Sequence, residues 1–193
     1  MLGVSYRGGL SGQRPDGQWV DGPRGTDPAV LKVGRYDKYL LAILDRAAEP
    51  ARAPTTRMQL VPDRNPLALR RGDRLRVQLL WDGKPLPGVA IMADYADNAD
   101  LKHGVTDADG RLELAVQNQG LNVIGAMWIE PVAGDAEIDF VEHLATLTFA
   151  LRPLSHQPGY MHPAMRPAVT SASAKLQGLP PSEQAMPMLD STD

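Results

Sequence analysis

The chain has 193 residues, enough for one full domain with extensions or for two small domains. Its 43% hydrophobic residues allow a real core, and 18 Gly and 17 Pro favour short strands and turns over a helical bundle. The net charge of −3 argues against nucleic-acid binding through a basic surface, and the absence of cysteine excludes disulfides, thiolate zinc sites and cysteine nucleophiles. No run of about 20 apolar residues is present that could span a membrane.

The first 54 residues predict a loop followed by a short helix. Residues 1–28 are Gly-rich and polar without a sustained period, and they lack the basic and apolar regions of a secretory signal. Trp19 in this loop could dock onto a partner, although an incidental loop aromatic is the simpler interpretation. Pro50 would end the helix that follows. The apolar residues of this segment recur at helical spacing: Tyr36, Tyr39, Leu40, Ile43 and Leu44.

Residues 55–153 predict a β-sandwich. Within 74–81, apolar residues alternate with Arg74, Arg76 and Gln78, which is typical of a half-buried strand, and Asp82-Gly83 predicts a tight turn after it. Further strands are expected at 58–61, 89–95, 104–106, 111–116, 121–129 and 144–151. The predicted fold class is therefore all-β, a seven-stranded antiparallel Ig-like or prealbumin-like sandwich with one short N-terminal helix.

The remaining residues, 154–193, are rich in Pro, Ser, Ala and Gln and predict a largely disordered tail. The expected organisation thus has three parts. Residues 1–54 are the remnant of an N-terminal region, 55–153 are the sandwich, and 154–193 are the tail.

Three pieces of the sandwich carry a family resemblance. They are LVPDRNPLALRRGDRLRVQLLWDGKPLPG at 60–88, TDADGRLEL at 106–114 and LATLTFAL at 144–151. With them the chain resembles an uncharacterised bacterial family grouped with periplasmic components of cobalt/nickel ABC-type uptake systems. The resemblance implies a periplasmic location, a place as the second domain of a longer protein, and an envelope transport protein as partner. The TDADG turn is also similar to a hairpin of prealbumin-like and carboxypeptidase-regulatory-like sandwiches.

Four residues are candidate metal ligands. In the tail, His156 and His162 flank Met161, and imidazole and thioether groups suit nickel, cobalt or copper ions. His143 follows four acidic residues that could add oxygen ligands: Asp135, Glu137, Asp139 and Glu142. A solvated loop before the last strand explains the same pattern. A nickel or cobalt ion is the cofactor that these residues and the resemblance together suggest.

No arrangement in the sequence singles out catalysis. Neither a GxSxG motif nor a phosphate-binding loop is present, so we expect no enzyme. The expected function is a periplasmic accessory or binding component associated with nickel or cobalt uptake. The alternative is a structural, carbohydrate-binding or protein-binding sandwich at the cell envelope, which exposed tryptophans would favour. A prealbumin-like enzyme is a third hypothesis, and it would require histidine and arginine side chains that converge in a cleft.

Overall fold

The computed structural model describes residues 1–151 of the chain. This part consists of twelve strands joined by turns and two short 3-10 turns, η1 (Pro50–Arg52) and η2 (Pro66–Ala68). The strands are β1 (Leu2–Tyr6), β2 (Leu10–Gln13), β3 (Trp19–Asp21), β4 (Val33–Ile43), β5 (Met58–Pro62), β6 (Arg74–Trp81), β7 (Lys84–Pro85), β8 (Ala90–Met92), β9 (Gly104–Val105), β10 (Arg111–Ala115), β11 (Leu121–Pro131) and β12 (Phe140–Ala150). No helix in this part of the chain is long and apolar enough to cross a membrane.

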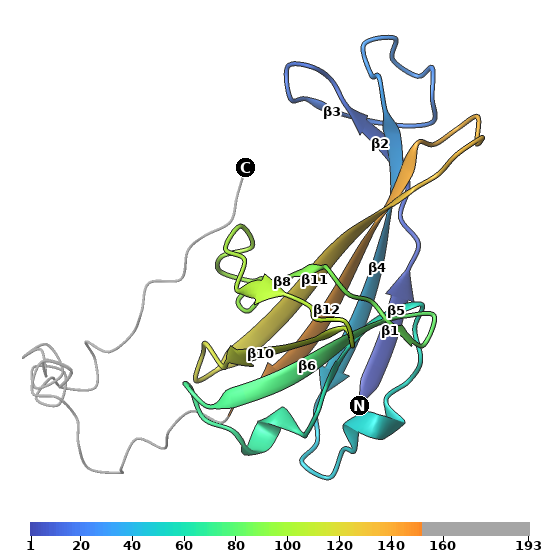
Figure 1. Cartoon of the computed structure of the whole chain (residues 1–193). Coiled ribbons are helices and arrows are strands. Elements are labelled where there is room, and N and C mark those ends of the chain that lie inside the picture. The colour runs from blue at the N-terminus through green and yellow to red at the C-terminus, as the bar shows by residue number, and fades with distance from the viewer. Residues whose placement is uncertain (152–193) are drawn as a thin grey trace, which may run out of the picture. The chain divides into compact units, whose positions relative to one another are not determined.

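The strands form two sheets that pack face to face. Sheet A has the order β3-β2-β4-β12-β11-β8-β9, with β1 beside β4, and sheet B has the order β10-β6-β5, with β7 beside β6. Figure 1 shows that sheet B covers only part of sheet A. The long strands β4, β11 and β12 run on past sheet B toward the end where β2 and β3 lie. Sheet A therefore has a covered half, which holds the core, and a projecting half.

The core lies between the sheets and is built from alternate residues of each strand. Leu75, Val77 and Leu79 of β6 are fully buried, and Leu147 and Phe149 of β12 face them from the other sheet. Burial of each such side chain contributes about 1.5–3 kcal/mol, so these rows hold the two sheets together. The all-β class and the two-sheet arrangement are thus confirmed.

The predicted N-terminal helix is wrong, because its residues form β4, an eleven-residue strand in the middle of sheet A. The inward residues of β4 follow a period of two, and this row contains Asp37 and Arg35 as well as Tyr39, Leu41 and Ile43. Arg35 and Asp37 form an ion pair at 3.1 Å, which satisfies both charges inside the row. The two charged residues interrupt the apolar alternation that is typical of a strand. Leu40 lies on the opposite face and adds an apolar residue at helical spacing, so the segment resembles an amphipathic helix in sequence.

The predicted count of seven strands and the purely antiparallel pairing are also wrong. Residues 1–151 contain twelve strands, four of them within residues 1–54. β4 pairs in parallel with β12 over ten residue pairs, from Gly34 opposite Phe140 to Ile43 opposite Phe149. Residues 1–54 therefore supply β1 to β4 of the main sheet. The prediction for 154–193 lies outside the described residues.

Two predicted turns are confirmed in detail. Asp82 and Gly83 both have positive φ angles, 47° and 77°, and they join Trp81 to its partner Lys84 in a tight hairpin. In the second turn, the Asp107 side chain accepts hydrogen bonds from the backbone N–H groups of Asp109 and Arg111. Both motifs thus serve folding.

The Asn-Pro motif at 65–66 also has a structural explanation. The Asn65 amide nitrogen donates to the carbonyls of Asp45, Arg46 and Ala48 at 2.8–3.0 Å, and its oxygen accepts from Leu67 N–H. This side chain fixes the connection that leaves β4 and starts η2 at the same time. Asn65, which lies in the first piece of the family resemblance, therefore serves folding.

The turn between β1 and β2 offers a matched pair of stability variants. A Cβ atom on Gly8 would lie 2.0 Å from the Tyr36 carbonyl oxygen, whereas a Cβ on Gly9 meets nothing within 4 Å. We expect Gly8→Ala to lower the free energy of unfolding by about 1–3 kcal/mol, because the backbone of β4 would have to shift. Gly9→Ala should stay within about 0.5 kcal/mol of the wild type. Urea unfolding followed by circular dichroism measures both, and equal losses would contradict this packing.

Candidate binding site

Three aromatic side chains meet on the projecting half of sheet A. Trp19 of β3 packs edge-to-face on Tyr36 of β4, with ring centroids 5.6 Å apart, and Tyr36 does the same with Phe140 of β12 at 6.1 Å. Phe140 lies directly over Gly34, where an added Cβ would come within 2.3 Å of the ring. Burial raises the pKa of Tyr36, and the neighbouring charge of Glu142 raises it further. The hydroxyl therefore stays protonated.

A small second core supports these aromatics. Val33, Ile138 and Val141 are buried together, apart from the main core. Asp139 stabilises the same region, because it accepts the Val33 N–H at 2.8 Å and pairs with Arg24 at 2.6 Å. The hydrogen bond from Arg24 lowers the pKa of Asp139, so its carboxylate stays charged. The projecting half is thus a packed structure in its own right.

The hairpin of β2 and β3 is held by Arg14. Its guanidinium forms an ion pair with Asp27 and donates to the Gln18 side chain at 2.8 Å. The hydrogen bond from Arg14 lowers the pKa of Asp27. The Asp16 carboxylate accepts the backbone N–H of Gln18 and closes the turn. Trp19, the first residue of β3, therefore sits on a fixed hairpin.

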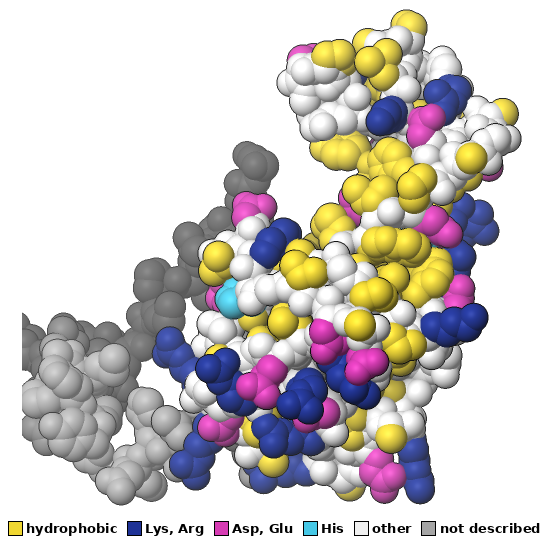
Figure 2. Space-filling view, in the orientation of Figure 1, with side chains coloured by type: hydrophobic (Ala, Val, Ile, Leu, Met, Phe, Trp, Pro, Cys, Tyr) yellow, Lys and Arg dark blue, Asp and Glu magenta, His cyan; other side chains and the backbone are white. Residues whose placement is uncertain are grey.

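A hollow of about 430 Å³ opens beside the three aromatics, and we call it the aromatic hollow. Trp19 is 59% exposed and Leu31 is 74% exposed, which is unusual for large apolar side chains. Figure 2 shows hydrophobic side chains grouped in this region, at and below the β2–β3 end. Among residues 1–151, the lining contains two cations and no acid: Gln13, Arg14, Pro15, Trp19, Leu31, Lys32, Tyr36 and Phe140. The hollow can hold a ligand with an apolar face, but it offers no acid–base pair.

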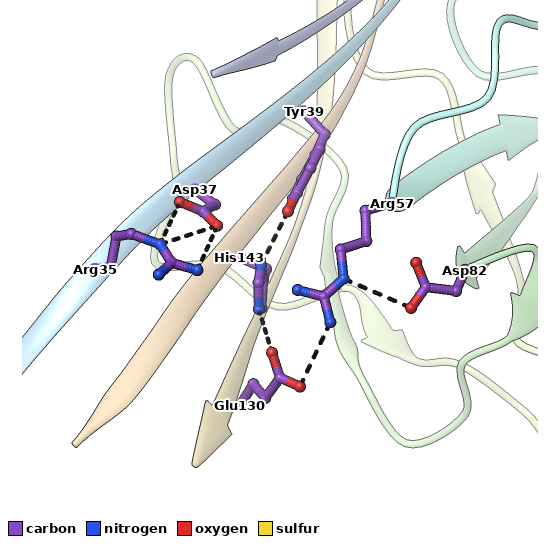
Figure 3. A network of polar contacts seen from close by, with 7 residues as sticks. All are labelled: Arg35, Asp37, Tyr39, Arg57, Asp82, Glu130 and His143. Atoms are coloured by element: carbon purple, nitrogen blue, oxygen red, sulfur yellow. Dashed lines mark hydrogen bonds and ion pairs between the residues drawn. The ribbon is translucent and has the colours of Figure 1, made fainter. Parts of the chain in front are cut away.

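A second constellation surrounds His143, which is fully buried at the end of the main core. Figure 3 shows its ring between Tyr39 and Glu130, with Arg57 linking Glu130 to Asp82. The Tyr39 hydroxyl lies 3.2 Å from Nδ1, and a Glu130 oxygen lies 3.1 Å from Nε2. Arg57 contacts Glu130 at 3.8 Å and Asp82 at 3.5 Å. The chain of contacts thus runs from the interior to the surface.

Aromatic rings enclose this histidine. Trp128 stacks on the His143 ring at 5.6 Å, and Trp81 meets it edge-on at 4.6 Å. The Arg57 guanidinium covers the outer side of Trp81, 4.2 Å from the ring centre. The apolar enclosure lowers the pKa of His143, and the hydrogen bond that its Nε2 donates to Glu130 opposes this only in part.

The protonation of the network follows from its partners. A charged Glu130 can only accept, so Nε2 carries the proton and Nδ1 accepts the Tyr39 O–H. In this arrangement both nitrogens of a neutral ring are engaged. A metal ion on His143 would have to displace Tyr39 or Glu130. The network therefore works as a buried structural bridge between β4, β11 and β12.

Within residues 1–151, the acidic residues of the predicted site do not converge on His143. Asp135 accepts the backbone N–H groups of Glu137 and Ile138 within its own loop, and Asp139 pairs with Arg24. Within residues 1–151, no three His, Asp or Glu side chains gather in a way that could hold a metal ion. His156, Met161 and His162 lie outside the described residues. The metal assignment of these three stays a prediction.

The aromatic hollow was mostly missed by sequence reasoning. The sequence predicts docking for Trp19, but it predicts a helix for Tyr36 and assigns no role to Phe140, which begins β12. Their meeting depends on the parallel pairing of β4 with β12, which no local pattern signals. A tryptophan inside a polar, Gly-rich segment was the one available sign.

The lowered pKa of His143 predicts a pH-dependent stability. A histidine that is harder to protonate in the folded state adds stability that is complete above its unfolded pKa of about 6.5, and this contribution is lost as the pH falls through the folded-state pKa. We expect the free energy of unfolding to fall between pH 7.5 and 5. His143→Gln should be less stable and should lack this step. His103→Gln, whose ring only accepts from Ala93 N–H, should keep it. Urea unfolding at several pH values measures the step, and its persistence in His143→Gln would contradict the assignment.

Comparison with known proteins identifies a family. A family model described as a domain of unknown function (DUF4198) matches residues 4–130, which include most of β1 and all strands from β2 to β10. No curated protein and no solved structure matches the chain. Since the match covers more than half of the sequence, the chain belongs to the family of the domain of unknown function DUF4198.

Proposed function

We propose that this chain is a non-catalytic binding module of the cell envelope that holds a saccharide in the aromatic hollow. The observation that carries the proposal is the exposed Trp19, fixed beside Tyr36 and Phe140 in a preformed hollow. We further infer, from the TDADG hairpin, that the sandwich is a variant of the Ig-like or prealbumin-like type. Absence of acid and histidine from the lining favours binding over catalysis.

The size of the hollow favours a small ligand. Small-molecule sites usually have volumes of about 300–1,000 Å³, and the hollow has about 430 Å³. A stable protein interface would need about 800 Å² of surface on each partner. The hollow itself is therefore matched to one or a few ligand rings.

The chemistry of the lining favours a sugar. A pyranose ring has an apolar face of C–H groups, which can stack on Trp19, and hydroxyl groups around its edge. Gln13 and Lys32 line the hollow, and an amide and an ammonium group can hydrogen-bond such hydroxyls. Because Arg14 is already paired with Asp27, a sugar acid such as a hexuronate would gain a further ion pair from Lys32.

The association with nickel or cobalt uptake and the periplasmic location are proposals that the family resemblance supports. Their candidate ligands are His156, Met161 and His162, beyond the described residues. Two roles could coexist in one envelope protein, since the hollow lies within residues 13–140.

The first test is a Trp19→Ala variant. Removal of a central aromatic contact typically costs 2 kcal/mol or more of binding energy, so we expect affinity to fall by at least about tenfold. Isothermal titration with hexuronate and hexose tetrasaccharides measures it, against Leu121→Ala as control. Leu121 is also exposed, at 57%, and begins β11 ten residues from the end that pairs with Phe140. No binding by the wild type, or equal binding by Trp19→Ala, would contradict the proposal.

The metal proposal has a separate test. Titration of the full chain with Ni²⁺ and Co²⁺ should release heat at tens of micromolar metal, and a His156→Ala, His162→Ala double variant should lose it. The variant His143→Gln should retain binding, because both nitrogens of His143 are already engaged. The absence of heat from the wild-type chain would remove direct metal binding.

A further inference from the structure

Strand β1 presents a free edge within the described part of the chain. It pairs with β4 through five residues, from Leu2 opposite Ala42 to Tyr6 opposite Lys38, and with no other strand of residues 1–151. An edge of this kind exposes a row of backbone N–H and C=O groups that can pair with another strand. The side chains add to this, because Leu2, Val4 and Tyr6 are 49%, 42% and 59% exposed.

The other sheet edges are protected in the usual ways. β3 has three residues, and β7 and β9 have two each, too short to template a stable pairing. β10 carries the charges of Arg111 and Glu113, and β5 is buried at four of its five residues and ends in Pro62. By contrast, β1 reads LGVSY and has neither a charge nor a proline.

The sequence of β1 is self-complementary. Leu2, Val4 and Tyr6 share the outer face of sheet A, while Gly3 and Ser5 point the other way, where a Cβ on Gly3 would touch Pro54. If a second β1 pairs antiparallel about Val4, Leu2 lies opposite the partner's Tyr6. Gly3 lies opposite the partner's Ser5, so apolar meets apolar and small meets small.

We propose that two copies of this chain associate by antiparallel pairing of their β1 strands, with Val4 on the two-fold axis. The pairing continues sheet A across both subunits and satisfies the free backbone groups of both edges. It joins the exposed apolar residues of β1 into one row. An unrelated strand would have to supply the same alternation of apolar and small residues, whereas a second copy supplies it by symmetry.

The absence of cysteine makes a register-specific test available. Directly opposed residues of antiparallel strands have Cα atoms about 4.5–5.5 Å apart, within the range of about 4.4–6.8 Å that a disulfide needs. In Val4→Cys the two thiols would be opposed. In Ser5→Cys, the matched control one residue away, the two Cα atoms would be about 8 Å apart and could not be bridged without backbone movement.

We expect Val4→Cys to form a disulfide-linked dimer at least about tenfold faster than Ser5→Cys at equal concentration. In light scattering, the wild type should have about twice the monomer mass of 20.9 kDa, and Val4→Lys should return it to the monomer. Circular dichroism of each variant checks that it is folded. A monomeric wild type, equal crosslinking rates, or a dimer that Val4→Lys leaves intact would overturn the proposal.

Discussion

The structure depends above all on the parallel pairing of β4 with β12. Ten residue pairs join a strand near the start of the chain to the last described strand, and they form the centre of sheet A. On its other side, β4 pairs with β1 and β2, and β2 pairs with β3, so within residues 1–151 these three strands join sheet A only through β4. Loss of the pairing would detach β1, β2, β3 and β4, four of the eight strands of sheet A. Because the two strands lie far apart in the sequence, their pairing closes a long loop, which costs chain entropy.

The aromatic hollow and the His143 network both depend on this pairing. Its first pairs bring Tyr36 and Phe140 together under Trp19 and create the aromatic hollow. One register step further, it sets Asp37 beside His143, and Tyr39 then reaches the imidazole. The two sites differ in character because sheet B covers only the second (Figure 1). Where both sheets are present, polar groups become a buried bridge, and where sheet A stands alone, aromatic rings remain available to a ligand.

The sequence predicted the covered half well and the projecting half poorly. Alternation such as that of Leu75, Val77 and Leu79 is local, so six predicted strands after residue 70 correspond to β6 and β8 to β12. The sequence predicts a helix where β4 lies, because the ion pair of Arg35 and Asp37 puts two charged residues on the inner face of this strand. His143 was singled out as a metal ligand, while its real neighbours Tyr39, Trp81 and Glu130 come from three other strands or their ends. Such convergence depends on strand register and sheet topology, and neither can be predicted from composition and periodicity.

The central functional claim is that ligand binds at Trp19 and not elsewhere. The chain has three tryptophans, of which Trp81 and Trp128 enclose His143. Their three indole N–H signals in a ¹⁵N-correlated NMR spectrum report on the two sites separately. Addition of a hexuronate tetrasaccharide should shift the Trp19 signal and leave the other two in place. A shift confined to Trp81 and Trp128, or no shift at saturating sugar, would contradict the account.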